Sequence, residues 1–131
     1  MKATEEVYHI YFEKDLEAVV MEWNGYSTSV QFREGTELML RTLVENKCAK
    51  VLADIRNMTL IGMEDQHWLE TDFLPRAIAS GFRAIAIITP VAYFNKVAVE
   101  TISYKVDKAK LVISYFDNRK SAEEWIGDFG S

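Results

Sequence analysis

Two short stretches of the chain, KVLADI at residues 50–55 and RAIAIIT at residues 83–89, decide the fold. Each contains an unbroken run of apolar side chains, Val51-Leu52-Ala53 in the first and Ala84–Ile88 in the second. Runs of this length are typical of strands that are covered on both faces, as in a parallel sheet with helices on either side. We therefore predict that the two stretches are the central strands of an α/β sheet.

The chain before these strands predicts a β-hairpin. Val7–Glu13 and Leu16–Trp23 are rich in β-branched and aromatic residues, as strands are. Only Lys14-Asp15 separates them, which indicates a tight turn between two antiparallel strands. Asn24-Gly25 is expected to end the second strand.

A helix is predicted to follow the hairpin. Thr28 and Gln31 have the spacing of a capping box, in which two side chains satisfy free backbone amides at the start of a helix. The helix should end near Asn46. Its apolar stripe, which we expect to face the sheet, consists of Phe32, Thr36, Met39, Leu40, Leu43 and Val44.

The remaining elements alternate between helices and strands. Glu64–Ser80 is helical in composition, and Pro75 should kink or split this helix. The order ββαβαβαβα is typical of an α/β domain with mostly parallel strands and helical crossovers. The later elements are predicted as a helix over Tyr93–Tyr104, a strand over Lys110–Phe116, and a helix over Asn118–Ile126 with Ser121 and Glu124 as its capping box.

Length and charge narrow the classes of function. A chain of 131 residues fits one domain, 1–131, and 49% hydrophobic residues suffice for a packed core. The net charge of −5, with no gathering of basic residues, excludes nucleic acid as an expected partner. No apolar run approaches the roughly 20 residues that span a bilayer. The start, MKATEE, is acidic where a secretory signal would be apolar, so we expect a cytoplasmic protein.

The sequence contains no recognisable catalytic or metal-binding motif. His9, His67 and the single Cys48 do not have the spacing of metal ligands, and a glycine-rich phosphate loop is absent. We therefore expect no catalytic residue, no metal site and no cofactor, and a protein that is not an enzyme. A hydrolytic or transfer enzyme that uses Asp54, His67 or Cys48 is the least favoured alternative, and it requires these groups to converge in one cleft.

The segment Asp54–Met63 is the first candidate for a binding site. Ligands of open α/β sheets usually bind beyond the carboxyl ends of the strands, where this segment is predicted to lie. One interpretation is that it contacts a protein partner. The other is that Asp54 and Arg56 form a local salt bridge and that Thr59 lies in a turn. The candidate partner-binding residues are Asp54, Arg56, Asn57, Thr59 and Glu64.

Aromatic residues suggest a second candidate site. The chain has three tryptophans, six tyrosines and seven phenylalanines, and most of them should fill the core. Large aromatic side chains also anchor interfaces and line apolar pockets. The candidate pocket between helices and sheet consists of Trp23, Trp68, Phe73 and Phe94.

The order of elements resembles the STAS domain, the fold of bacterial SpoIIAA-like anti-sigma-factor antagonists. STAS domains have a buried strand that ends in aspartate, which this chain matches with Val51-Leu52-Ala53-Asp54. The start of the next helix in STAS domains corresponds here to Leu60–Asp65. The chain is also similar, over nearly its whole length, to uncharacterised SpoIIAA-like (STAS/CRAL-TRIO-like) bacterial proteins. These landmarks are Trp23-Asn24-Gly25, Asp54-Ile55-Arg56, Trp68, Gly81–Ala86 before Pro90, and Ala122–Ile126.

The resemblance implies a non-enzymatic regulatory or protein-interaction domain that contacts a protein partner or forms a homodimer. The antagonists carry a phosphorylatable serine at the start of the second helix, where this chain has Gly62, Met63 and Glu64. Glu64 is either a fixed negative charge in place of a phosphate or a carboxylate that the helix dipole favours. The alternative function is a small carrier or sensor that holds an apolar or lipid-like ligand between helices and sheet.

Overall fold

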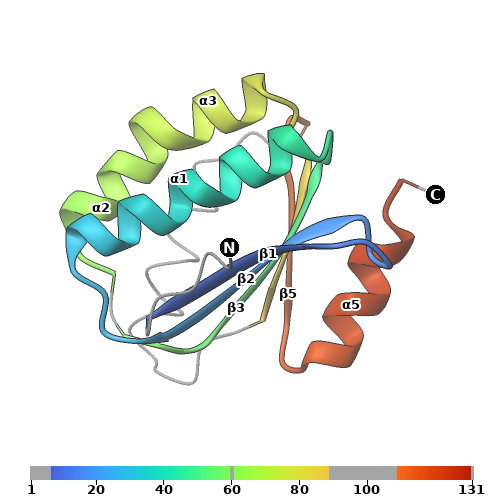
Figure 1. The fold of residues 1–131 in the computed structure, drawn as a ribbon, viewed down its shortest axis with the longest axis horizontal. Helices are drawn as coiled ribbons and strands as arrows, with labels where there is room; N and C mark the ends of the chain where they lie inside the picture. Colours follow the sequence, from blue (N-terminus) through green and yellow to red (C-terminus); the bar gives the residue numbers. More distant parts are fainter. Residues whose placement is uncertain (1–6, 60, 89–108, 131) are drawn as a thin grey trace.

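The computed structural model describes residues 7–59, 61–88 and 109–130 (Figure 1). These residues form one mixed sheet in the order β1-β2-β3-β4-β5. The first two strands pair antiparallel, and every later pair is parallel, so the predicted α/β fold is confirmed. The strands are β1 (Tyr8–Glu13), β2 (Ala18–Gly25), β3 (Lys50–Met58), β4 (Ala84–Ile88) and β5 (Val112–Phe116).

Helices cover both faces of the sheet (Figure 1). One layer contains α1 (Ser29–Glu45) and a continuous helical segment made of α2 (Met63–Trp68), the π-helical turn η1 (Leu69–Phe73) and α3 (Leu74–Ala79). The opposite face carries α5 (Arg119–Asp128). The helix predicted over Tyr93–Tyr104 lies outside the described residues.

Alternating side chains along the strands build two separate cores. On β2, Val19, Met21 and Trp23 belong to the larger core beneath α1. Ala18 and Val20 point the other way and join the smaller core. That core is rich in alanine, which lets α5 pack closely against the sheet. It consists of Ala18, Val20, Leu52, Ala84, Ala86, Ile88, Ala122 and Ile126.

Helix α1 begins and ends as its sequence predicts. The Thr28 hydroxyl accepts from the Gln31 amide at 3.1 Å, and the Gln31 side-chain oxygen accepts from the Thr28 amide at 3.0 Å. The predicted stripe is buried, with one error, because Val44 is 50% exposed. At 100° per residue, Val44 lies about 120° around the helix axis from Phe32, outside the face that contacts the sheet.

Gly35 brings α1 into close contact with the sheet. A Cβ atom at this position would lie 2.6 Å from Cη2 of Trp23, so only glycine fits without movement of the ring. Trp23 is itself packed between Tyr8 and Phe32, with ring centroids 5.3 and 5.6 Å away. The contact therefore sets how closely α1 approaches β2.

Two strand boundaries differ from the prediction. The hairpin turn spans Lys14–Glu17 rather than two residues, and β2 starts at Ala18. Strand β3 continues beyond Ile55 to Met58, because its last residues still pair with Asn24 and Gly25 of β2. The first part of the expected loop, through Met58, is therefore strand.

Two helix predictions are also refined. Pro75 neither breaks nor splits the second helical segment; instead, η1 widens the turn just before it, with the Leu74 amide donating to the Leu69 carbonyl. The predicted Ser121 and Glu124 capping box is wrong. Helix α5 starts where the prediction over Asn118–Ile126 placed it, but its cap is Asn118, whose side chain accepts from the Ser121 amide at 2.8 Å.

We predict that Gly35→Ala destabilises the protein by about 1–3 kcal/mol, because the added methyl group overpacks the buried Trp23 ring. Helix propensity alone predicts the opposite, a gain of about 1 kcal/mol. Urea unfolding followed by circular dichroism distinguishes the two. Glu34→Ala, at the exposed neighbouring position, is the control and should change stability little. An increase in stability for Gly35→Ala would contradict the close packing.

Candidate functional site

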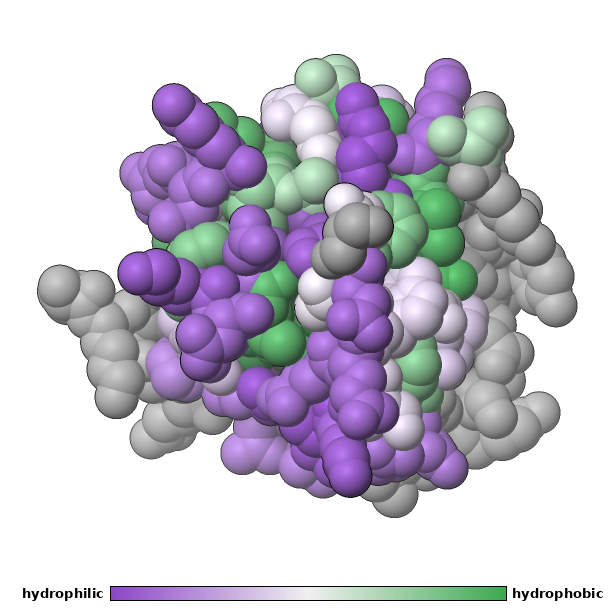
Figure 2. Space-filling model, turned by 90° about the vertical axis from the view of Figure 1, so that its right-hand side faces the viewer, coloured by the Kyte–Doolittle hydropathy of each residue, from purple (hydrophilic) through white to green (hydrophobic). Residues whose placement is uncertain are grey.

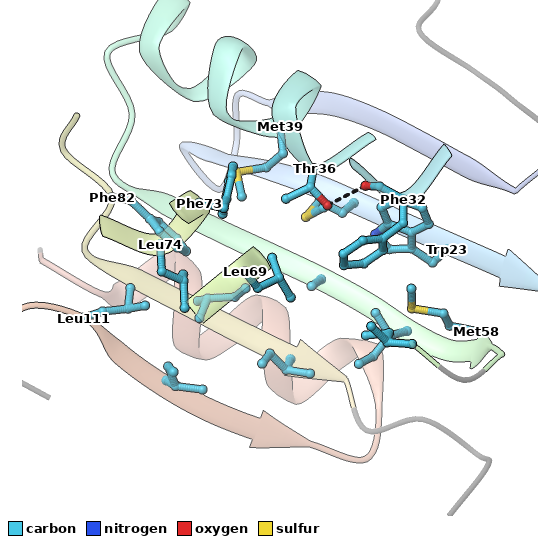
Figure 3. Close-up of a pocket in the computed structure, with 17 residues that line it drawn as sticks. Trp23, Phe32, Thr36, Met39, Met58, Leu69, Phe73, Leu74, Phe82 and Leu111 are labelled. Atoms are coloured by element: carbon cyan, nitrogen blue, oxygen red, sulfur yellow. Dashed lines mark hydrogen bonds between the residues drawn. The ribbon is translucent and has the colours of Figure 1, made fainter. Parts of the chain in front are cut away.

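A cavity of about 130 Å³ lies between the sheet and the helix layer of α1, η1 and α3 (Figure 3). It extends along the strands, from Phe82 and Leu111 before β4 and β5 to Met58 at the carboxyl end of β3. The helices contribute Phe32, Thr36, Met39, Leu69, Phe73 and Leu74, and the strands contribute Met21, Trp23, Ala53, Ile55, Ile85, Ile87 and Ile113.

The wall of this cavity is almost entirely apolar. Thr36 contributes the one hydroxyl group among the described lining residues. That hydroxyl donates to the Phe32 carbonyl at 2.7 Å, a bond within α1 that leaves its hydrogen engaged (Figure 3). The described lining therefore offers no charged group for recognition, and the space suits a group that makes only van der Waals contacts.

The volume is sufficient for a small molecule. Protein interiors are usually packed without voids of this size. For comparison, an apolar cavity of about 150 Å³ stays dry and binds benzene. The space of about 130 Å³ is therefore close in size to one that accommodates a small ring.

The structure brings together two of the four predicted pocket residues. Trp23 and Phe73 line the cavity. Trp68 lies outside it, on a surface hollow with Arg33, and its ring centroid is 5.5 Å from that of Phe73. Phe94 lies outside the described residues. Sequence analysis missed the role of α1, although the apolar stripe that it identified includes the lining residues Phe32, Thr36 and Met39.

The five predicted partner-binding residues do not form one site. Asp54 and Arg56 lie on β3 and face α5, and Asn57 and Thr59 are exposed near the end of that strand. Glu64 lies in the first turn of α2, in the layer on the other side of the sheet. The structure corrects the expectation that a loop begins at Asp54, because pairing with β2 extends β3 to Met58.

Asp54 and Arg56 form the predicted local salt bridge. The Arg56 Nε and Nη2 atoms donate to the two carboxylate oxygens of Asp54 at 3.0 and 2.7 Å. Arg119 at the start of α5 lies 3.6 Å from the same carboxylate. The pair thus belongs to a larger polar network on the α5 face of the sheet.

Glu22 is at the centre of that network. Its carboxylate accepts from Arg119 Nη1 at 2.9 Å and from the Tyr11 hydroxyl at 3.3 Å, and it lies 3.2 Å from His9 Nδ1. These bonds connect α5 to the first two strands. Strand alternation places His9, Tyr11 and Glu22 on one face, but no sequence signal indicated that Arg119 would join them.

The network shifts the pKa values of its acids. Burial alone would raise the pKa of Asp54, but hydrogen bonds and charge from Arg56 outweigh it and lower that pKa. The pKa of Glu22 is likewise lowered, because Arg119 outweighs the effect of burial. Both acids are therefore ionised and engaged at neutral pH, as expected of a stabilising network.

Comparisons with known proteins identify the fold. No protein-family model and no curated protein matches this chain. Among solved structures, it is similar to an uncharacterised protein of the DUF3478 family from Shewanella loihica PV-4, which has a SpoIIAA-like fold. The two chains are 16% identical, with a TM-score of 0.65, and the match covers 96% of this chain and 98% of the other. The expected SpoIIAA-like fold is thus confirmed.

Within residues 7–59, 61–88 and 109–130, none of the helices has the length and apolar character that crossing a bilayer requires.

We predict that Asp54→Asn lowers the free energy of unfolding at pH 7 by about 1 kcal/mol. As the pH falls, the variant should lose less of this free energy than the wild type does. Because the folded-state pKa of Asp54 is lowered, its contribution is complete above the unfolded-state value of about 4 and disappears as pH falls through the folded-state value. Urea unfolding between pH 7 and pH 2 measures this. Asp15→Asn, in the exposed hairpin turn, is the matched control. Equal acid sensitivity in wild type and Asp54→Asn would disprove the role of this network.

Proposed function

We propose that this SpoIIAA-like domain is a non-enzymatic carrier or sensor that holds a small apolar ligand between its helices and its sheet. The observation that carries the proposal is the cavity of about 130 Å³, with its apolar wall and its one described hydroxyl already engaged by the backbone. A ligand of this class needs shape and apolar contact rather than charged partners.

The energetic cost of an empty cavity supports this function. Side chains that line an unfilled space of about 130 Å³ lose van der Waals contacts and stabilise the fold less than a filled core would. An apolar ligand that fills it recovers part of these contacts, which is the driving force for binding. Rigid rings such as Trp23 and Phe73 in the wall keep the space from collapsing.

A protein-contact role is the second candidate, and exposed apolar side chains favour it. Tyr26, Val30 and Met63 are 69%, 67% and 84% exposed. They flank the amino ends of α1 and α2, which are joined by a 2.7 Å hydrogen bond from Ser29 to Asp65. Exposed apolar side chains that form a contiguous patch mark protein interfaces. By contrast, hydrophilic residues predominate on the face of the molecule in Figure 2, with only small hydrophobic groups between them.

For the carrier function, we predict that benzene binds the protein and that Ala53→Leu weakens this binding at least about ten-fold, a loss of about 1.4 kcal/mol. Ala53 lines the cavity from β3, so a larger side chain occupies the space that the ligand needs. Isothermal titration calorimetry measures both affinities. Ala79→Leu makes the same change at an exposed position of α3 and should bind as wild type does. Absence of benzene binding, or equal binding by Ala53→Leu, would refute the carrier function.

For the protein-contact function, we predict that Met63→Lys weakens self-association by removing an exposed apolar side chain from the surface at the start of α2. Sedimentation equilibrium of the purified protein measures this. The same variant should unfold at nearly the wild-type urea concentration, since position 63 is exposed. A wild-type protein that is monomeric at all concentrations would exclude the homodimer form of this candidate.

A further inference from the structure

Arg33 of α1 is held in place at the surface of the helix layer. Its Nε atom donates to Asp65 in the first turn of α2 at 3.0 Å, and the same carboxylate oxygen accepts from the Ser29 hydroxyl at 2.7 Å. The guanidinium carbon lies 5.1 Å from the centroid of the Trp68 ring. Among the described residues, Nη1 and Nη2 of Arg33 have no hydrogen-bond acceptor. Arg33 therefore has donors left that a partner molecule can use.

Glu64, which carries the opposite charge, lines the same surface hollow as Arg33 and Trp68. It lies in the first turn of α2 and is exposed. Within residues 7–59, 61–88 and 109–130, its carboxylate forms no hydrogen bond and no ion pair. The hollow thus contains a positive and a negative group whose remaining hydrogen-bonding capacity is unused.

An exposed apolar side chain accompanies these charges. Met63, the neighbour of Glu64, is 84% exposed and lines the same hollow. Arg33 also lines a second hollow, together with Val30, which is 67% exposed. Tryptophan, arginine and methionine are the residue types that are enriched in protein interfaces. Methionine side chains also pack favourably against aromatic rings. The surface around Arg33 therefore has the composition of an interface.

The two unpaired charges indicate what kind of partner this surface fits. A partner surface that carries only acids is repelled by Glu64, and one that carries only bases is repelled by Arg33. A second copy of this chain carries both charges in the same arrangement. When two identical patches meet around a two-fold axis, each contact between different residues occurs twice. Opposite charges can then face each other at two places.

We propose that Arg33, Met63, Glu64 and Trp68 form the contact of a symmetric homodimer. Glu64 of each copy accepts from the Nη atoms of Arg33 in the other, and Met63 enters the other copy's hollow beside Trp68. Both contacts can form together, because Met63 and Glu64 are adjacent in the chain and Arg33 lies over the Trp68 ring. The inference rests on the protein-contact candidate of the proposed function and names its partner.

A charge swap tests the contact between the two copies. Glu64→Arg alone and Arg33→Glu alone each place like charges against each other twice, so each should associate at least about 100-fold more weakly than the wild type. An equimolar mixture restores opposite charges at both places. It should form a one-to-one dimer with a Kd near the wild-type value. Sedimentation equilibrium of the full-length protein at low ionic strength measures these associations.

Glu64→Gln is a milder variant, because Arg33→Glu also faces Asp65 and can weaken the fold. It removes two exposed ion pairs from each dimer and should raise the Kd about three- to ten-fold. Its midpoint of urea unfolding should stay near that of the wild type, since position 64 is exposed. Glu45→Gln, an exposed acid at the other end of α1, is the matched control and should leave the Kd unchanged.

The outcomes separate this contact from the homodimer in general. A wild type that is monomeric at all concentrations overturns both. If Met63→Lys weakens association but the two Glu64 variants associate as the wild type does, the homodimer stands and the paired contact is overturned. A mixture of the two folded charge variants that stays monomeric also overturns it. If Arg33→Glu does not fold, the two Glu64 variants decide. Weaker association of these variants, with the control unchanged, supports the contact.

Discussion

The contact between Trp23 and Gly35 is the constraint on which the arrangement of this protein depends. The indole ring fills the space between β2 and α1 at one side of the larger core, and the missing side chain of Gly35 lets the helix rest on it. Away from this contact, smaller side chains such as Ala53 face the helix layer. The helix cannot descend further without displacing the ring, and a cavity is left beside it.

The two faces of the sheet are packed in different ways. On the α5 face, alanines allow close approach, and the acids Glu22 on β2 and Asp54 on β3 are neutralised by Arg119 and Arg56. On the α1 face, large rings and aliphatic chains line the cavity. The α5 face therefore gains stability from hydrogen bonds and ion pairs. The α1 face is less stable than a filled core would be, but it contains a space that a ligand can fill.

Features that depend on residues close together in the sequence could be predicted. Features that depend on residues far apart in the sequence could not. The buried runs around Leu52 and Ile87 and the Thr28 cap depend on near neighbours, so their strands and helix were predicted correctly. The true length of β3 depends on pairing with Asn24, which no local pattern reports. Trp23 and Phe73 were recognised as pocket residues by type alone. The cavity itself, however, depends on how α1 and η1 sit over the sheet.

The bond between Glu22 and Arg119 joins groups 97 residues apart in the chain. During synthesis, the hairpin that carries Glu22 leaves the ribosome long before Arg119 is made. Until then, its carboxylate and the alanine-rich face beside it have no helix to cover them. Such long-range contacts slow folding, since a large loop must close before they form. The smaller core is therefore complete only once α5 has been made, because this helix carries Ala122 and Ile126.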